Sequence, residues 1–221
     1  MPRIALLTLL LALLIPGGGM SQPAPASRLL FHGKPVYLNG INVPWNNFGA
    51  DFGCRYDERY FERMFRELRQ YGVNSVRVWL HIDGRCQPVF AEGMTVGLTS
   101  RFYEHFDDFL ARAQRYNIAV MPVLWSFDMT YQQTLRSPLI TDVAKTNSYI
   151  EKALIPMVKR YATHKALLAW EIINEPEWSI KETPCNAAKH DCVSLLQMQR
   201  FVGLQAAAIR ANTAQYVTVG S

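Results

Sequence analysis

Ala169-Trp170-Glu171-Ile172-Ile173-Asn174-Glu175-Pro176-Glu177-Trp178 is the stretch that decides the fold. Residues 166–174 are mostly apolar, which predicts a strand buried on both faces, as in parallel sheets. The strand ends in Asn174 and Glu175, and Pro176 stops it from continuing. Polar groups at the carboxyl end of such a strand stand where α/β barrels carry their chemistry. We therefore expect Glu175 to lie in an active site.

Strand and helix patterns alternate along the chain. After a strand entry over residues 27–40, we predict strands over 36–42, 73–82, 118–124, 166–174 and 216–220, of which 36–42, 118–124 and 166–174 are expected to be buried. The intervening apolar spacing predicts helices over 57–72, 102–117 and 193–212, the first with Asp57 as its N-cap. Ser148 and Glu151 form a predicted capping box for a further helix, which Pro156 should kink.

Strand-helix alternation predicts a parallel sheet, which leaves two architectures open. One is a doubly wound sheet and the other is a (β/α)8 TIM barrel. We favour the barrel because polar and aromatic residues follow the strand ends in every repeat and no glycine-rich phosphate turn follows the first strand. Five strands cannot close a barrel of eight, so residues 27–221 are expected to form the amino-terminal portion of an incomplete barrel.

The amino terminus has the pattern of a secretory signal peptide. Basic Met1-Pro2-Arg3 precedes the apolar run 4–15, and Ala24-Pro25-Ala26 is a small-residue cleavage site. We predict removal of residues 1–26 and an extracellular protein with no membrane contact after cleavage. An uncleaved membrane anchor is the alternative.

An oxidising compartment favours disulfides, and the chain has 4 cysteines. Cys185 and Cys192 bracket a short loop after the strand at 166–174, whereas Cys54 and Cys86 follow two earlier strands. Of the three possible connectivities we choose 54 with 86 and 185 with 192. The spacing does not match a zinc site, so we expect no metal.

The net charge of +5 is spread over predicted helix faces that also carry acidic residues. No basic stripe interleaved with aromatic residues is found, so we expect no nucleic-acid partner.

Three segments together resemble glycoside hydrolase family 5: Leu38–Asn42, Asn74–Trp79 and Trp170–Pro176 look like its first, second and fourth barrel strands. The resemblance covers residues 28–221. Within the family, the chain is most similar to secreted endo-β-1,4-mannanases, on the segments Arg77–Gly84, Pro88–Phe90 and Val123–Trp125. Cellulases of the family share most of this pattern.

The resemblance implies a retaining mechanism with two glutamates, in which Glu175 is the general acid/base. The family's nucleophile lies on strand seven, beyond Ser221, so these residues alone are expected to be inactive. Asn174 matches the asparagine that binds the sugar hydroxyl beside the reacting carbon; a turn residue is the alternative. Arg77 matches the arginine that hydrogen-bonds the nucleophile; an ion pair with Glu171, buried deeper in the strand, is the alternative.

Aromatic residues after strand ends suggest a sugar-binding surface, because indole rings stack on pyranose rings. The predicted contacts are Trp45, His81, Trp125 and Trp178; the alternatives are that the tryptophans fill core space and that His81 is a structural group. Trp79 and Trp170 lie within strands and are assigned to the core.

The expected substrate is a neutral polysaccharide, either mannan or β-glucan. We expect the reaction to need no cofactor and the complete protein to be a monomer. Two other classes remain open. One is a non-catalytic carbohydrate-binding remnant, and the other is a metal-dependent barrel hydrolase, which the lack of a ligand cluster disfavours.

Overall fold

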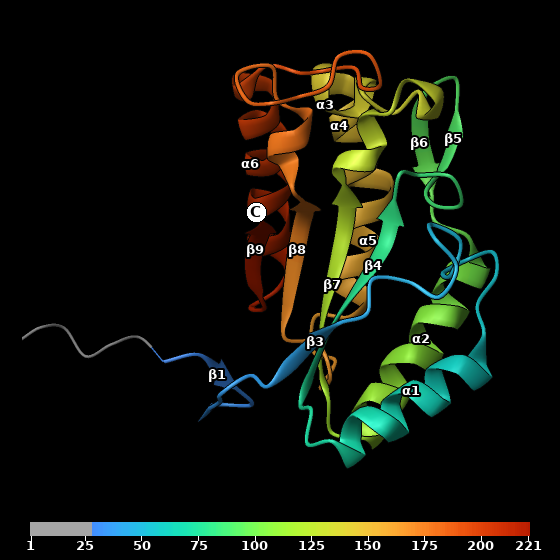
Figure 1. Ribbon diagram of the computed structural model, residues 1–221, viewed down its shortest axis with the longest axis vertical. Helices are drawn as coiled ribbons and strands as arrows, with labels where there is room; N and C mark the ends of the chain where they lie inside the picture. The colour runs from blue at the N-terminus through green and yellow to red at the C-terminus, as the bar shows by residue number, and fades with distance from the viewer. Residues whose placement is uncertain (1–27) are drawn as a thin grey trace, which may run out of the picture.

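The computed structural model describes residues 28–221, so the predicted signal peptide lies outside the described residues. Five strands form one parallel sheet in the order β3-β4-β7-β8-β9. Their bounds are β3 Gly40–Asn42, β4 Ser75–Ile82, β7 Ala119–Ser126, β8 Ala169–Asn174 and β9 Tyr216–Gly220. The strands follow chain order without the reversal that a doubly wound sheet requires. Figure 1 shows this arc, with the carboxyl ends of the strands at the top.

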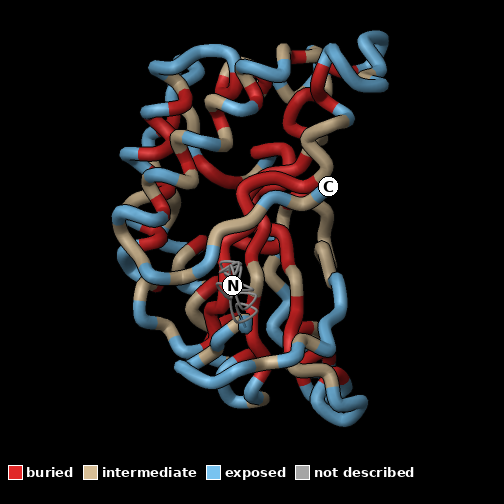
Figure 2. The backbone as a smooth tube through the Cα atoms, turned by 90° about the vertical axis from the view of Figure 1, so that its left-hand side faces the viewer, coloured by how far each residue is buried: buried red, intermediate tan, exposed pale blue. Residues whose placement is uncertain are grey.

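Helices cover the outer face of the arc, and their apolar sides meet the strands. The long ones are α1 Glu58–Gln70, α2 Ser100–Arg115 and α6 Leu195–Asn212. In α1, the predicted N-cap Asp57 accepts the N–H of Tyr60, and Phe61 and Phe65 are buried toward α2 and the sheet. The strands form the buried centre and the outer helix faces are exposed (Figure 2).

The segment between β7 and β8 differs from the prediction. It contains α3 Pro138–Thr141, α4 Val143–Tyr149, a π turn Ile150–Leu154 and α5 Ile155–Arg160. The predicted capping box is wrong, because Asp142 caps α4 and Ser148 lies inside that helix. The Ser148 hydroxyl donates to the Lys145 carbonyl and accepts the N–H of Thr95. The expected irregularity near Pro156 takes the form of the π turn directly before α5.

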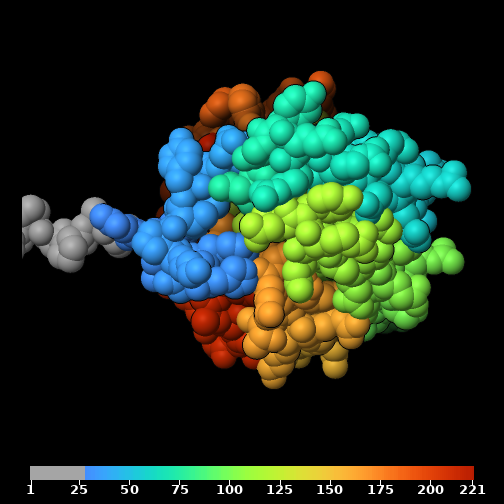
Figure 3. All heavy atoms as spheres, turned by 90° about the horizontal axis from the view of Figure 1, so that it is seen from below, coloured from blue at the N-terminus to red at the C-terminus, as the bar shows by residue number. Residues whose placement is uncertain are grey.

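The first strand is shorter and more exposed than predicted. Only Gly40–Asn42 pair with β4, and all three are exposed because β3 is an edge strand of the described sheet. The preceding residues form a hairpin of β1 Leu30–Phe31 and β2 Lys34–Pro35. This hairpin lies across the lower end of the sheet (Figure 3). There Phe31 packs on a cluster containing Leu168, and the N–H of Leu30 donates to the Tyr216 hydroxyl at 3.1 Å.

Loops and short elements surround the upper end of the sheet. They are the hairpin β5 Val89–Ala91 and β6 Met94–Gly97, and the 3-10 turns η1 Phe127–Thr130, η2 Gln132–Thr134 and η4 Pro176–Ser179. Both predicted disulfides, 54–86 and 185–192, are confirmed and lie in these loops. Within residues 28–221 there is no helix long and apolar enough to cross a membrane.

Candidate active site

Arg77 is the centre of a polar cluster on the inner face of the arc. Its Nε and Nη2 donate to the two carboxylate oxygens of Glu171, the Nε bond measuring 2.7 Å. Nη1 donates to Asn42 Oδ1 at 3.0 Å. Because β7 lies between β4 and β8, the guanidinium crosses over one strand to make this pair. The predicted Arg77–Glu171 ion pair is therefore confirmed, and Glu171, only 2% exposed, is fully engaged.

Asn174 connects this pair to Glu175. Its Oδ1 accepts from Arg77 Nη2 at 2.7 Å, and its Nδ2 donates to Glu175 Oε2 at 2.8 Å. Arginine can only donate, so the amide oxygen must face Arg77 and the amide nitrogen must face the carboxylate. The amide thus has one permitted orientation, and Glu175 Oε1 stays free of this network.

A register shift brings Asn174 to the inner face. Strict alternation would place Glu171 and Asn174 on opposite faces, since they are three residues apart. Between their pairings with Thr218 and Gly220, however, β8 uses three steps where β9 uses two. This bulge reverses the alternation, so both side chains reach Arg77.

Two residues other than glycine adopt left-handed backbone at the carboxyl ends of strands in the parallel sheet. Glu175 has φ 48° directly after β8, and Ile82 has φ 59° at the end of β4. For a β-branched residue such as Ile82 this conformation is a genuine outlier, and strain of this kind gathers at functional sites. The Glu175 N–H is held by the Gly220 carbonyl at 2.8 Å, which fixes the turn that presents its carboxyl group.

Gly220 and Asn42 are part of the site, although neither was among the predicted site residues. A Cβ at Gly220 would stand 2.2 Å from Glu171 Oε1 and 3.0 Å from Arg77 Nη2, so the ion pair leaves no room for a side chain. Their position at strand ends was the signal that could have identified them.

The predicted aromatic contacts divide into exposed and buried residues. Trp178, in η4 directly after Glu175, is 45% exposed. Trp45 is half-buried and meets Trp79 edge to face, with ring centroids 5.2 Å apart. Both can lie against a ligand. Trp79 and Trp170 are in the core, as predicted.

Trp125 and His81 require a correction, because both are completely buried. Their rings lie 5.1 Å apart, and each packs against Tyr149. Burial lowers the pKa of His81 to about 3, which keeps the imidazole neutral. The two side chains fill the layer between sheet and helices and do not reach the surface where a sugar would bind.

The loop carboxylates beside the site differ in their surroundings. Asp83, after β4, is 3% exposed and pairs with Arg85. Asp128, in η1 after β7, accepts from the Ser126 hydroxyl, and burial raises the pKa of its carboxyl group. No group of three or more possible metal ligands occurs within the part of the chain that the structure describes.

The chain is similar in sequence and fold to known proteins. The family model described as Cellulase (glycosyl hydrolase family 5) matches residues 30–221. A mannan endo-1,4-beta-mannosidase of Mytilus edulis is 34% identical over 216 residues, covering 88% of this chain and 59% of the relative. The crystal structure of the Mytilus edulis β-mannanase superposes with a TM-score of 0.77 over 86% of this chain and 60% of that chain.

The β-1,4-D-mannanase structure from Cryptopygus antarcticus has a TM-score of 0.80 at 27% identity, covering 88% of this chain and 59% of that one. The chain therefore spans about three fifths of the length of these relatives.

Proposed function

The chain belongs to glycosyl hydrolase family 5, and from that premise we propose that the protein hydrolyses a β-1,4-linked polysaccharide by the retaining mechanism, with Glu175 as general acid/base. The observation that carries the proposal is the chain of hydrogen bonds from Arg77 through Asn174 to Glu175 at the carboxyl ends of parallel strands.

In the proposed mechanism, the two carboxyl oxygens of Glu175 have separate tasks. Oε2 accepts the Asn174 amide, so Oε1 is the oxygen available to hold the acidic hydrogen. In the first step that proton moves to the departing glycosidic oxygen, and in the second the carboxylate removes a proton from water. The hydrogen bond from the Asn174 amide to Oε2 holds the carboxylate in position after the first transfer.

The second carboxylate of a retaining pair attacks the anomeric carbon from the opposite face, roughly 5 to 5.5 Å from the first. Glu171 does not suit this task, since both its oxygens bind Arg77 and it is buried. The family resemblance assigns the nucleophile to the seventh strand of the complete eight-stranded barrel, which is a different strand from β7. The parallel sheet described here contains five of the eight barrel strands. Assays should therefore use a protein that includes all eight barrel strands, which we call the full-length protein.

We propose mannan as the substrate, because the similar curated proteins from Mytilus edulis and Cryptopygus antarcticus carry the name mannan endo-1,4-beta-mannosidase. β-Glucan is the second candidate, favoured by the family description Cellulase. Neither substrate requires a cofactor. Initial rates on the two polysaccharides decide between them.

The decisive variant is Glu175→Gln in the full-length protein, because glutamine keeps the shape and removes the proton donor. We expect kcat on mannan to fall by roughly 10²–10⁴-fold. Glu151→Gln, an exposed carboxylate in the π turn, is the matched control and should keep full activity. Unchanged turnover in Glu175→Gln would refute the assignment.

Secretion and the monomeric state are further parts of this proposal. Two disulfides support export to an oxidising compartment. Amino-terminal sequencing of the exported protein should begin after Ala26. Light scattering of the full-length protein should give the mass of one chain.

A further inference from the structure

Arg85 lies at the upper end of β4, on the same edge of the sheet as Glu175, and the proposed mechanism does not use it. Its Nε and Nη2 both donate to the Asp83 carboxylate, the Nη2 bond measuring 2.6 Å. Its Nη1 has no hydrogen-bond partner within the described residues, and its side chain is 53% exposed. Asp83 therefore fixes the position of the guanidinium and leaves the Nη1 donors available to a ligand.

A row of aromatic rings connects Arg85 to the active site. The Arg85 guanidinium lies over the Phe48 ring, 4.6 Å from its centroid. Phe48 meets Trp45 edge to face at 4.9 Å, and Trp45 meets Trp79 at 5.2 Å. The Arg77 guanidinium lies 5.4 Å from the Trp79 ring. The buried Trp79 ring and the half-buried Trp45 and Phe48 rings thus form a continuous row from the catalytic cluster to an exposed guanidinium.

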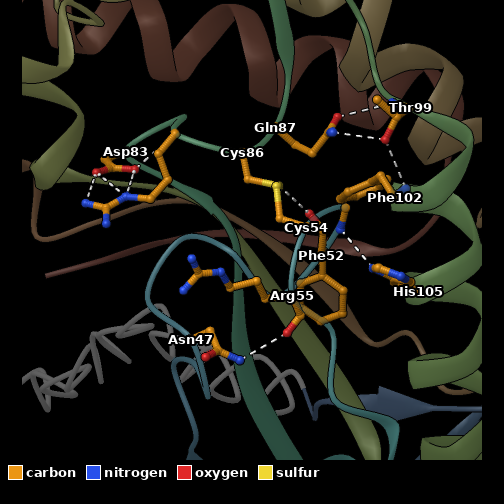
Figure 4. The surroundings of a disulfide bond; sticks show 12 residues. Asn47, Phe52, Cys54, Arg55, Asp83, Cys86, Gln87, Thr99, Phe102 and His105 are labelled. Carbon is orange, nitrogen blue, oxygen red and sulfur yellow. Dashed lines mark hydrogen bonds and ion pairs between the residues drawn. A yellow bond between two sulfur atoms is a disulfide. The ribbon is translucent and has the colours of Figure 1, made fainter.

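The loops that carry this row are anchored at several points. The buried Asp51 carboxylate accepts the backbone N–H groups of Asn46 and Asn47. The Cys54–Cys86 disulfide joins the loop after β3 to the loop after β4, beside the Asp83 pair (Figure 4). Gly49 lets the stem of Arg85 lie against the first loop, since a Cβ there would stand 3.0 Å from Arg85 Cδ. The surface is built before any ligand arrives, which lowers the entropic cost of binding.

We propose that Arg85, with the Trp45–Phe48 ring pair, forms a sugar-binding surface that holds a pyranose of the polysaccharide at a distance from the bond being cleaved. The inference rests on the proposed function. Rings supply apolar contact for the C–H face of a sugar, and the free Nη1 donates to its hydroxyl oxygens. Asp83 cancels the charge of Arg85, so the surface suits a neutral hydroxyl-bearing chain better than an anion.

The test measures binding of β-1,4-linked manno-oligosaccharides of two and six units by calorimetry, on full-length protein carrying Glu175→Gln so that the ligand is not cleaved. Arg85→Met should raise the Kd of the hexasaccharide about tenfold, the loss of one hydrogen bond to a charged donor. The disaccharide, which we expect to occupy the sites beside Glu175, should bind with a Kd changed less than twofold.

Arg115→Met is the matched control, because Arg115 is 63% exposed, pairs with Glu62 at 3.5 Å and lies on α2. It should leave both Kd values unchanged. Arg85→Lys keeps a positive charge beside Asp83 but loses the planar guanidinium with its several fixed N–H donors. Its Kd for the hexasaccharide should therefore lie between those of the parent and Arg85→Met.

The outcomes separate this inference from the proposed function. The proposed sugar-binding surface alone is overturned by either of two results. In one, Arg85→Met leaves the Kd of the hexasaccharide unchanged; in the other, it raises the Kd of both ligands by the same factor. A protein with intact Glu175 that neither binds nor cleaves mannan or cellulose overturns the proposed function and this inference together.

Discussion

The two ends of the same five strands are built differently. At the lower end, the β1–β2 hairpin covers apolar residues, and the Asn74 side chain makes neutral hydrogen bonds to the Asn39 N–H and the Tyr37 carbonyl. At the upper end, the Arg77–Glu171 ion pair extends through Asn174 to Glu175, and left-handed residues stand at the ends of β4 and β8. The difference teaches that changes at the lower end should affect stability alone, whereas changes at the upper end should affect both stability and chemistry.

A matched change at each end tests this separation. The largest effect is expected for Gly220→Ala at the upper end, because the new Cβ collides with the Glu171 carboxylate, which Arg77 holds in place. Disrupting this buried pair should lower the free energy of unfolding by about 3 kcal/mol and reduce activity together with it.

At the lower end, Gly33→Ala meets no atom within 4 Å and strains only a turn residue at φ 71°. Its expected cost is about 1 kcal/mol, with unchanged kcat. Urea titration and mannan hydrolysis measure both variants. Equal losses in the two variants would contradict the division between the ends.

A pair of asparagines sharpens the comparison. Asn174→Ala removes the amide that joins Arg77 to Glu175, so kcat should fall about 10²-fold, or roughly 2.7 kcal/mol. Asn74→Ala removes two lower-end hydrogen bonds and should cost about 1–2 kcal/mol of stability. Its kcat should stay within twofold. Steady-state kinetics and thermal melts should show that Asn174→Ala mainly lowers kcat and that Asn74→Ala mainly lowers stability. A lower kcat in Asn74→Ala would contradict the difference between the two ends.

Two histidines give the pH test. Burial holds the pKa of folded His81 at about 3, below the unfolded value of about 6.5. As the pH falls below 6.5 the unfolded chain binds the proton first, so the His81 contribution to stability is present above pH 6.5 and is lost progressively toward pH 3. Between pH 7 and pH 5 the loss is about 2 kcal/mol.

His81→Gln should flatten this dependence of the unfolding free energy on pH. At the lower end, the half-buried His164 also has a pKa lowered chiefly by burial. His164→Gln should therefore change the slope in the same direction and by less. If His164→Gln changed the pH slope of the unfolding free energy more than His81→Gln, the larger effect would lie at the lower end, contrary to this prediction.

The smallest effect is expected for Tyr216→Phe, which removes the hydrogen bond from the Leu30 N–H at the lower end. The cost should be about 0.5–1 kcal/mol with no change in kcat or KM. Differential scanning calorimetry resolves a change of this size. An activity loss would show that the hairpin influences the catalytic end.

The sequence predicted the repeated elements because apolar spacing reports burial directly. The strand Tyr216–Gly220 and the N-cap Asp57 were found as expected. The helix start after β7 was missed because Ser148 and Glu151 fit a capping pattern as well as Asp142 fits an N-cap, and local spacing does not separate the two. Trp125 and His81 were assigned to the wrong environment, since a strand end shows where a side chain stands along the sheet and not how deeply it is covered.

By itself, the sequence determined the alternation of strands and helices and the presence of Glu175 at a strand end, because each depends on residue type and spacing along the chain. Only the tertiary structure decided that Asn174 joins Arg77 and that Gly220 must have no side chain. Both depend on a register shift between β8 and β9 and on a guanidinium that crosses β7. These are relations between residues far apart in the chain, and spacing within one strand does not contain them.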